Sequence, residues 1–102
     1  MGIEVVVEDE NGTRVASLED PSNILHRALP AREDSAYRHL NCVDWYGDTI
    51  FNRHQIADLR EELTRLAMSK ADENERRMIR QVDMLAALCE AEPHLYLKFY
   101  GD

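Results

Sequence analysis

The chain has 102 residues, 44% of them apolar and 31% charged, which is typical of one folded domain spanning residues 1–102. The net charge of −8, from 20 acidic and 12 basic residues, argues against nucleic acid as a partner, because phosphate contacts need Lys or Arg. No segment is apolar over the length of a membrane helix, and the first residues do not match a signal peptide. We therefore expect a cytoplasmic protein with no membrane partner. Two cysteines are too few for a disulfide framework, and we expect Cys42 and Cys89 to be reduced core residues.

The first 18 residues predict a β-hairpin. Residues 3–8 are rich in β-branched side chains and alternate in the manner of a half-buried strand. Asn11-Gly12 follows, a dipeptide that suits a two-residue hairpin turn because both residues tolerate positive φ. A turn of that length would fix the register, with the pairs Val5–Leu18, Val7–Ala16 and Asp9–Arg14.

The middle of the chain predicts a short helix and a third strand. Asp20-Pro21 has the pattern of an N-cap followed by the first helical residue, and Pro30 would end that helix. Residues 31–36 are polar and we expect a loop there. Residues 37–46 then alternate in polarity and predict the third strand, which Gly47-Asp48 would end.

Two long helices and a final strand are expected after that point. Asn52 and Gln55 form a capping-box pattern at the start of the first helix. Asp72 and Glu75 form a second capping-box pattern at the start of the second helix, which Pro93 ends. Residues 94–100 then alternate cleanly between apolar and polar and predict a half-exposed strand.

The predicted order is two strands, a helix, a strand, two helices and a strand. Because helices and strands do not alternate strictly, we expect an α+β fold rather than a doubly wound parallel sheet. The expected architecture is a mainly antiparallel four-stranded sheet with the helical hairpin 52–92 packed on one face. The other face would be solvated or buried in a homodimer, and its expected side chains are Glu4, Val6, Glu8, Tyr96, Lys98 and Tyr100.

The segment from Asp44 to Arg53 is the first candidate site, because it joins a predicted strand end to a helix start. Two carboxylates near one turn can share a proton or hold a cation, and a helix N-terminus can bind an anion. The same residue types also serve as ordinary turn and cap residues, so a purely structural role is the alternative. The candidate ligand- or partner-binding residues here are Asp44, Tyr46, Asp48, Thr49, Asn52 and Arg53.

No spacing of Cys, His or acidic residues matches a zinc site or a calcium loop, so we expect no metal and no cofactor. No catalytic motif is present either, and we expect a non-enzymatic protein-interaction module, an immunity- or antitoxin-like inhibitor or an adaptor. Its partner would be a basic protein, drawn by acidic side chains. The expected acidic patch consists of Glu4, Glu8, Asp9, Glu10, Glu19 and Asp20. The alternative is a small ligand-binding or catalytic domain centred on the Asp44–Arg53 turn.

The segment from Asp44 to Asn52, followed by an amphipathic helix and a chain ending Phe99-Tyr100-Gly101-Asp102, resembles a set of small bacterial proteins of unassigned function. Those proteins share a segment of the type Tyr-Gly-Asp-Thr-x-Phe-Asn. The resemblance covers roughly half of this chain. It implies a bacterial source and carries no activity over.

Overall fold

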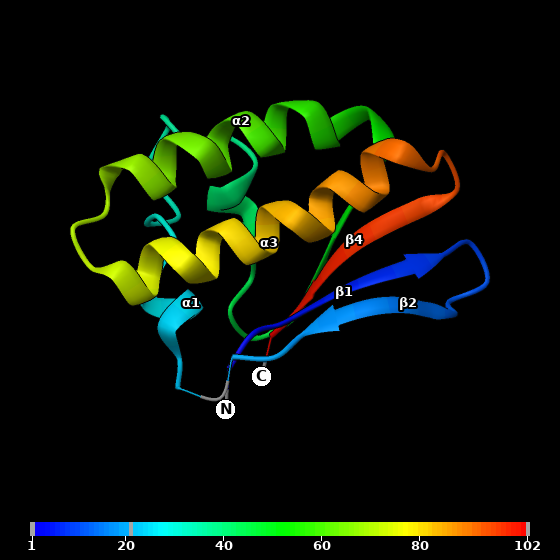
Figure 1. The fold of residues 1–102 in the computed structure, drawn as a ribbon, viewed down its shortest axis with the longest axis horizontal. Coiled ribbons are helices and arrows are strands. Elements are labelled where there is room, and N and C mark those ends of the chain that lie inside the picture. Colours follow the sequence, from blue (N-terminus) through cyan, green and yellow to red (C-terminus); the bar gives the residue numbers. More distant parts are fainter. Residues whose placement is uncertain (1, 21, 102) are drawn as a thin grey trace.

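The computed structural model describes residues 2–20 and 22–101 and has the expected α+β architecture. Two long helices, α2 (Arg53–Ser69) and α3 (Glu73–Ala91), form one layer over a four-stranded antiparallel sheet (Figure 1). None of the helices in the described residues is long and apolar enough to cross a membrane. The remaining elements are the strands β1 (Glu4–Asp9), β2 (Arg14–Leu18), β3 (Asp48–Phe51) and β4 (Leu95–Tyr100), the short helix α1 (Ile24–Ala28) and a 3₁₀ turn, η1 (Leu40–Cys42).

The strands lie in the order β2-β1-β4-β3, so the first and last strands of the chain form the centre of the sheet. The predicted hairpin pairs Val5–Leu18 and Val7–Ala16 are confirmed, but the pair Asp9–Arg14 is wrong, because Arg14 lies opposite Glu8 at a β-bulge. The cause is the turn. Its backbone closes between Asp9 and Thr13 rather than around a two-residue loop, and Gly12 takes a left-handed conformation with φ 80°.

The predicted third strand over residues 37–46 is wrong. This segment forms turns and η1, and the third strand starts at Asp48, where we expected a strand to end. The Asp44 carboxylate accepts a hydrogen bond from the backbone N–H of Tyr46, which folds the chain into a local turn instead of an extended strand. Cys42 is exposed here, so its predicted place in the core is also wrong.

The helix boundaries follow the predicted caps. Asn52 and Gln55 form the complete capping box of α2. At α3 only half of the predicted box forms: the Asp72 side chain accepts from the N–H groups of Asn74 and Glu75, while the Glu75 carboxylate lies 3.8 Å from the Lys70 ammonium instead of returning a bond to Asp72. At α1 the outcome differs in detail, because Asn23 holds the cap position while the buried Asp20 carboxylate accepts from the N–H groups of Ile24 and Leu25 at 2.8 and 2.7 Å. Pro21, the other half of that predicted helix start, lies outside the described residues.

The core lies between the sheet and the two long helices. β1 and β4 each send alternate side chains inward, and Phe99 meets Phe51 edge to face at 5.7 Å between ring centroids. Cys89 of α3 is buried in this core as predicted, and desolvation raises the pKa of its thiol to about 11. The core includes Val5, Val7, Leu97 and Phe99 from the sheet, and Ile56, Leu59, Leu63, Ile79, Val82 and Ala86 from the helices.

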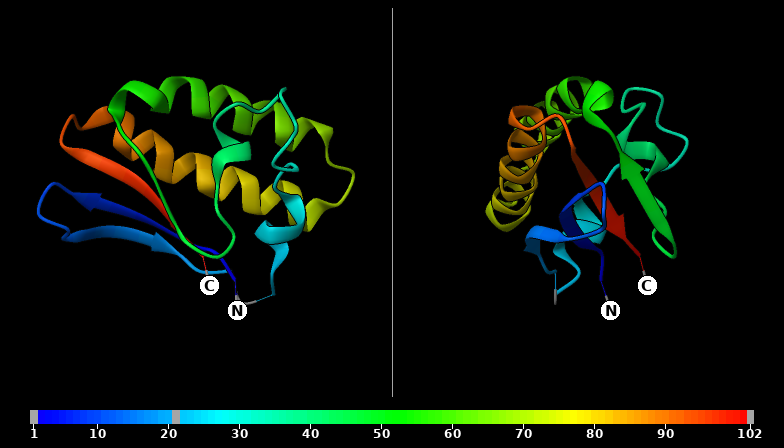
Figure 2. Two further views of the ribbon diagram at one scale, coloured as in Figure 1. Left: turned by 180° about the vertical axis from the view of Figure 1, so that it is seen from behind. Right: turned by 90° about the vertical axis from the view of Figure 1, so that its right-hand side faces the viewer.

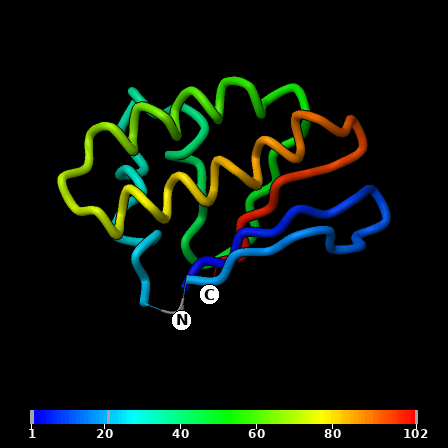
Figure 3. Tube along the Cα trace, in the orientation of Figure 1, coloured from blue at the N-terminus to red at the C-terminus, as the bar shows by residue number. Residues whose placement is uncertain are grey.

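The β1–β2 turn and the α2–α3 turn lie at opposite ends of the molecule (Figures 2 and 3). In the described residues, α1 packs on α3 and η1 packs on α2, so the helices all lie on one side of the sheet. On the other side of the sheet, which we call the outer face, residues 2–20 and 22–101 form no helical layer.

Candidate functional site

The predicted site between Asp44 and Arg53 is a tightly hydrogen-bonded turn. The Asp44 carboxylate accepts from the Tyr46 N–H at 2.9 Å, and the Asp44 N–H donates to the Thr49 hydroxyl oxygen at 2.9 Å. Asn52 caps α2 by accepting from the His54 N–H at 3.0 Å. Asp44, Thr49 and Asn52 are therefore already engaged by the turn and the helix that follows.

Other members of this predicted site face solvent. Tyr46 is 75% exposed, and Asp48 and Arg53 are also exposed. Gly47 folds so closely over Asp44 that an added Cβ would lie 2.8 Å from its carboxylate. The three pockets described below are lined by other residues. A ligand-binding role for the turn stays a prediction, while the contacts found here are those of a structural turn.

The acidic residues of the predicted patch make different contacts and do not act as one surface. Glu4 forms an ion pair with Arg14 at 2.9 Å, and Glu8 is buried in a network described below. Asp9 holds the hairpin turn by accepting from the N–H groups of Asn11 and Thr13, and Asp20 holds α1. The other two, Glu10 and Glu19, are exposed.

A buried ionic network lies on the outer face of the sheet. The Glu8 carboxylate is only 5% exposed, and it accepts from the Lys98 ammonium at 2.8 Å and the Tyr100 hydroxyl at 2.7 Å. These two hydrogen bonds lower the pKa of Glu8, and the same bonds raise the pKa values of Lys98 and Tyr100. The network therefore favours the ionised carboxylate of Glu8, the charged ammonium of Lys98 and the protonated hydroxyl of Tyr100.

The rest of the outer face combines apolar, aromatic and charged side chains. Val15 is 55% exposed and Ile50 is 54% exposed, on strands at the two edges of the sheet. The Arg14 guanidinium lies 5.9 Å from the centre of the Tyr100 ring. Strand register and alternation place on this face Glu4, Val6, Glu8, Val15, Ser17, Asp48, Ile50, Tyr96, Lys98 and Tyr100, and the β-bulge adds Arg14, which lies opposite Glu8.

A shallow hollow of about 200 Å³ lies at the end of the outer face next to the hairpin turn. It is lined by Asp9, Glu10, Ile50, Tyr96 and Lys98, and we call it the Tyr96 hollow. Lys98 stands opposite Ile50, while Tyr96 stands opposite Glu8, so the register of three neighbouring strands assembles it. Pockets that bury a whole drug-sized ligand are about 300–1,000 Å³, and this hollow is closer to the size of one side chain.

His39 and Glu62 form a contact that the sequence analysis missed. The Glu62 carboxylate on α2 is 4% exposed and accepts from the N–H groups of His39 and Leu40 at 3.0 Å. The ring Nδ1 of His39 lies 2.6 Å from the second carboxylate oxygen. A signal was present, because Glu62 falls on the apolar stripe of α2 between Leu59 and Leu66.

This pair lines a polar cavity of about 230 Å³ beside α2. With Nδ1 directed to the carboxylate, the Nε2 atom of His39 is the ring nitrogen left to make a further hydrogen bond. The charged groups that line this cavity are nonetheless already bonded within the protein. Arg65 pairs with Glu61 and also donates to the backbone oxygen of Ala36. Glu62 and Arg65 thus fasten the loop before β3 to α2. The described residues contain no cluster of three or more ligands suited to a metal.

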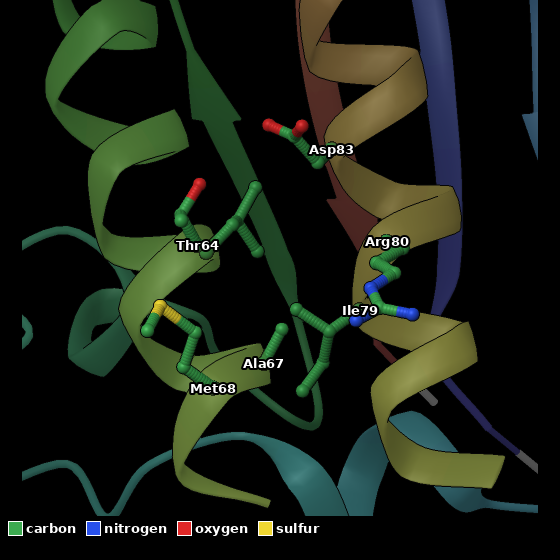
Figure 4. Close-up of a pocket in the computed structure, with 7 residues that line it drawn as sticks. Thr64, Ala67, Met68, Ile79, Arg80 and Asp83 are labelled. Atoms are coloured by element: carbon green, nitrogen blue, oxygen red, sulfur yellow. The ribbon is translucent and has the colours of Figure 1, made fainter. Parts of the chain in front are cut away.

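A third pocket, of about 180 Å³, lies between the two long helices. Thr64, Ala67 and Met68 of α2 face Ile79, Arg80 and Asp83 of α3 across it (Figure 4). Asp83 is paired with Arg60 at 2.9 Å, and Met68 is 80% exposed at the edge. This groove lies along the packing interface of α2 and α3 and is not a site on which polar groups converge.

Comparison of the chain with models of known protein families, with curated proteins and with solved structures found no match.

Proposed function

We propose that this chain is a protein-interaction module that binds a basic partner protein through the outer face of its sheet. The observation that carries the proposal is the exposure of Val15 and Ile50 on the outer face of the sheet, on either side of the buried Glu8 network. Apolar and aromatic side chains on a rigid scaffold provide the anchors of protein interfaces. The network between them fixes the long side chains of Lys98 and Tyr100, so binding would cost little of their side-chain entropy.

The charge of the chain favours a basic partner. The net charge is −8, and the exposed Asp48 and Glu10 lie at the border of the outer face. Complementary charge speeds the encounter of two proteins and selects among partners more than it adds affinity. An inhibitor that must recognise a basic protein, or an adaptor that recruits one, would use such a surface.

The alternative of a ligand-binding or catalytic centre on the Asp44–Arg53 turn has less support. The carboxylate of Asp44, the hydroxyl of Thr49 and the side chain of Asn52 are occupied by backbone groups. A catalytic constellation needs polar groups that converge on a cavity.

The test is affinity capture from the native host with two matched variants. Val15→Arg places a positive charge on the outer face, and Met84→Arg places the same charge on α3, where Met84 is 68% exposed. We expect wild type and Met84→Arg to retain the same basic protein and Val15→Arg to lose it. The purified pair should bind more weakly as salt rises.

A partner that Val15→Arg binds as well as Met84→Arg does would overturn the proposal. Loss of binding in both variants would point instead to a general charge effect. Assay of the captured partner with and without this chain then separates an inhibitor from an adaptor.

A further inference from the structure

We propose that the Tyr96 hollow receives an arginine side chain of the basic partner protein. This inference rests on the proposed function and specifies the chemistry of one contact within it. The hollow is lined by an aromatic and an aliphatic residue, Tyr96 and Ile50, and by two acidic residues, Asp9 and Glu10. An arginine has the corresponding parts, an apolar stem and a planar cation.

The local charge balance favours a cation. Lys98 is the basic residue of the hollow, and its ammonium is already bound to the Glu8 carboxylate at 2.8 Å. Glu8 therefore neutralises Lys98, and the carboxylates of Asp9 and Glu10 leave the hollow with excess negative charge. An incoming acidic side chain would be repelled.

The two carboxylates have oxygen atoms free to accept. One oxygen of Asp9 accepts from the backbone N–H groups of Asn11 and Thr13 at 2.9 Å, which fixes the orientation of the side chain and leaves its Oδ2 atom. Glu10 is exposed and makes no hydrogen bond or ion pair with the described residues 2–20 and 22–101. A guanidinium carries five N–H donors and can serve both residues together.

The aromatic wall favours arginine over lysine. A guanidinium is weakly hydrated and stacks on an aromatic face, whereas an ammonium is compact and strongly hydrated. Tyr96 lies on the central strand β4 and pairs with Glu8 of β1, so the sheet holds its backbone in place.

The first test needs no knowledge of the partner. The full chain, labelled with ¹⁵N, is titrated with acetyl-Gly-Arg-Gly-amide, with the lysine analogue and with the citrulline analogue, which is isosteric with arginine but uncharged. We expect saturable NMR shift changes at the residues of the hollow for arginine, weaker ones for lysine and none for citrulline. Equal effects of arginine and citrulline, or shifts spread over the whole chain, would refute the inference.

Two variants address the same point. Glu10→Gln removes one charge from an exposed side chain, and Tyr96→Leu removes the ring but keeps an apolar group. Each should weaken the arginine peptide about two- to fivefold, the usual size of one exposed ion pair or cation–π contact. Arg32→Gln, an exposed site outside the hollow, is the control and should bind as wild type does.

The captured partner separates this inference from the proposed function. If Val15→Arg abolishes partner binding while Glu10→Gln and Tyr96→Leu leave it unchanged, the interaction surface stands and the arginine contact is wrong. If Val15→Arg has no effect, the proposed function fails, and the peptide titration still decides whether the hollow takes arginine.

Discussion

Replacing Glu62 with alanine should be among the most destabilising single changes on α2. The carboxylate accepts from two backbone N–H groups, of His39 and Leu40, and its second oxygen lies 2.6 Å from the His39 ring. Leaving a buried donor without a partner costs about 1–3 kcal/mol for each group. Because these contacts are coupled, we expect a total loss of about 3–5 kcal/mol, the range for breaking a buried pair.

That loss is large beside the stability of a domain of this size, which is about 5–15 kcal/mol. Urea denaturation followed by circular dichroism measures it as a lower midpoint at unchanged slope. Glu62→Gln should fall between alanine and wild type, since the amide oxygen still accepts while the amide N–H₂ faces other donors.

The neighbouring residue supplies the control. Glu61 is exposed and pairs with Arg65 one turn along the same helix. Glu61→Ala should therefore change the midpoint little. If Glu62→Ala loses no more stability than Glu61→Ala, the buried carboxylate does not hold the loop before β3 on α2.

Three further outcomes follow from the contacts described above. Because the folded state lowers the pKa of Glu8, its stabilisation is complete above the unfolded value of about 4.3 and is lost as pH falls through the lower folded value. Urea unfolding of Glu8→Gln should thus show a deficit in stability at neutral pH that shrinks in strong acid, and a deficit independent of pH would contradict the network. A thiol reagent at pH 8 should modify the exposed Cys42 quickly. It should modify Cys89 only on unfolding, because burial raises the pKa of Cys89 to about 11. Replacing Cys42 with serine (Cys42→Ser) should remove the fast phase of the reaction. Gly101→Ala should lower the melting temperature, since its Cβ would lie 2.5 Å from the Trp45 carbonyl oxygen and such overpacking costs about 1–3 kcal/mol; an unchanged melting temperature would show that the turn can move aside.

Local patterns predicted the parts of the fold that depend on neighbours in the chain. The pairs Val5–Leu18 and Val7–Ala16 and the caps at Asn52 and Asp72 follow from short-range rules. The failure over residues 37–46 has a physical cause, because a short mixture of apolar and polar residues does not by itself distinguish a strand from a series of turns that buries some of its side chains. Leu40 and Val43 are buried there without forming a strand.

The proposed interaction surface depends on contacts that no local pattern contains. Glu8 meets Lys98 and Tyr100 only because β1 pairs with β4, and nothing in the sequence specified that neighbour. The sequence analysis did place Glu8, Lys98 and Tyr100 on one face, yet it could not predict that they bond to each other. Glu62 was recognisable as a charged residue on an apolar stripe, but its partner at His39 lies in a loop of irregular structure.

The central position of β4 has a consequence for the order in which the chain folds. The β1–β2 hairpin and β3 are joined in the sheet only through β4, so without β4 the sheet consists of two separate pieces. Closing the segment between β1 and β4 costs about 4 kcal/mol of chain entropy, whereas the hairpin and the α2–α3 pair form from residues close in sequence. A nascent chain can therefore form its hairpin and helices early, but the outer face comes into existence only when the last strand pairs with the first.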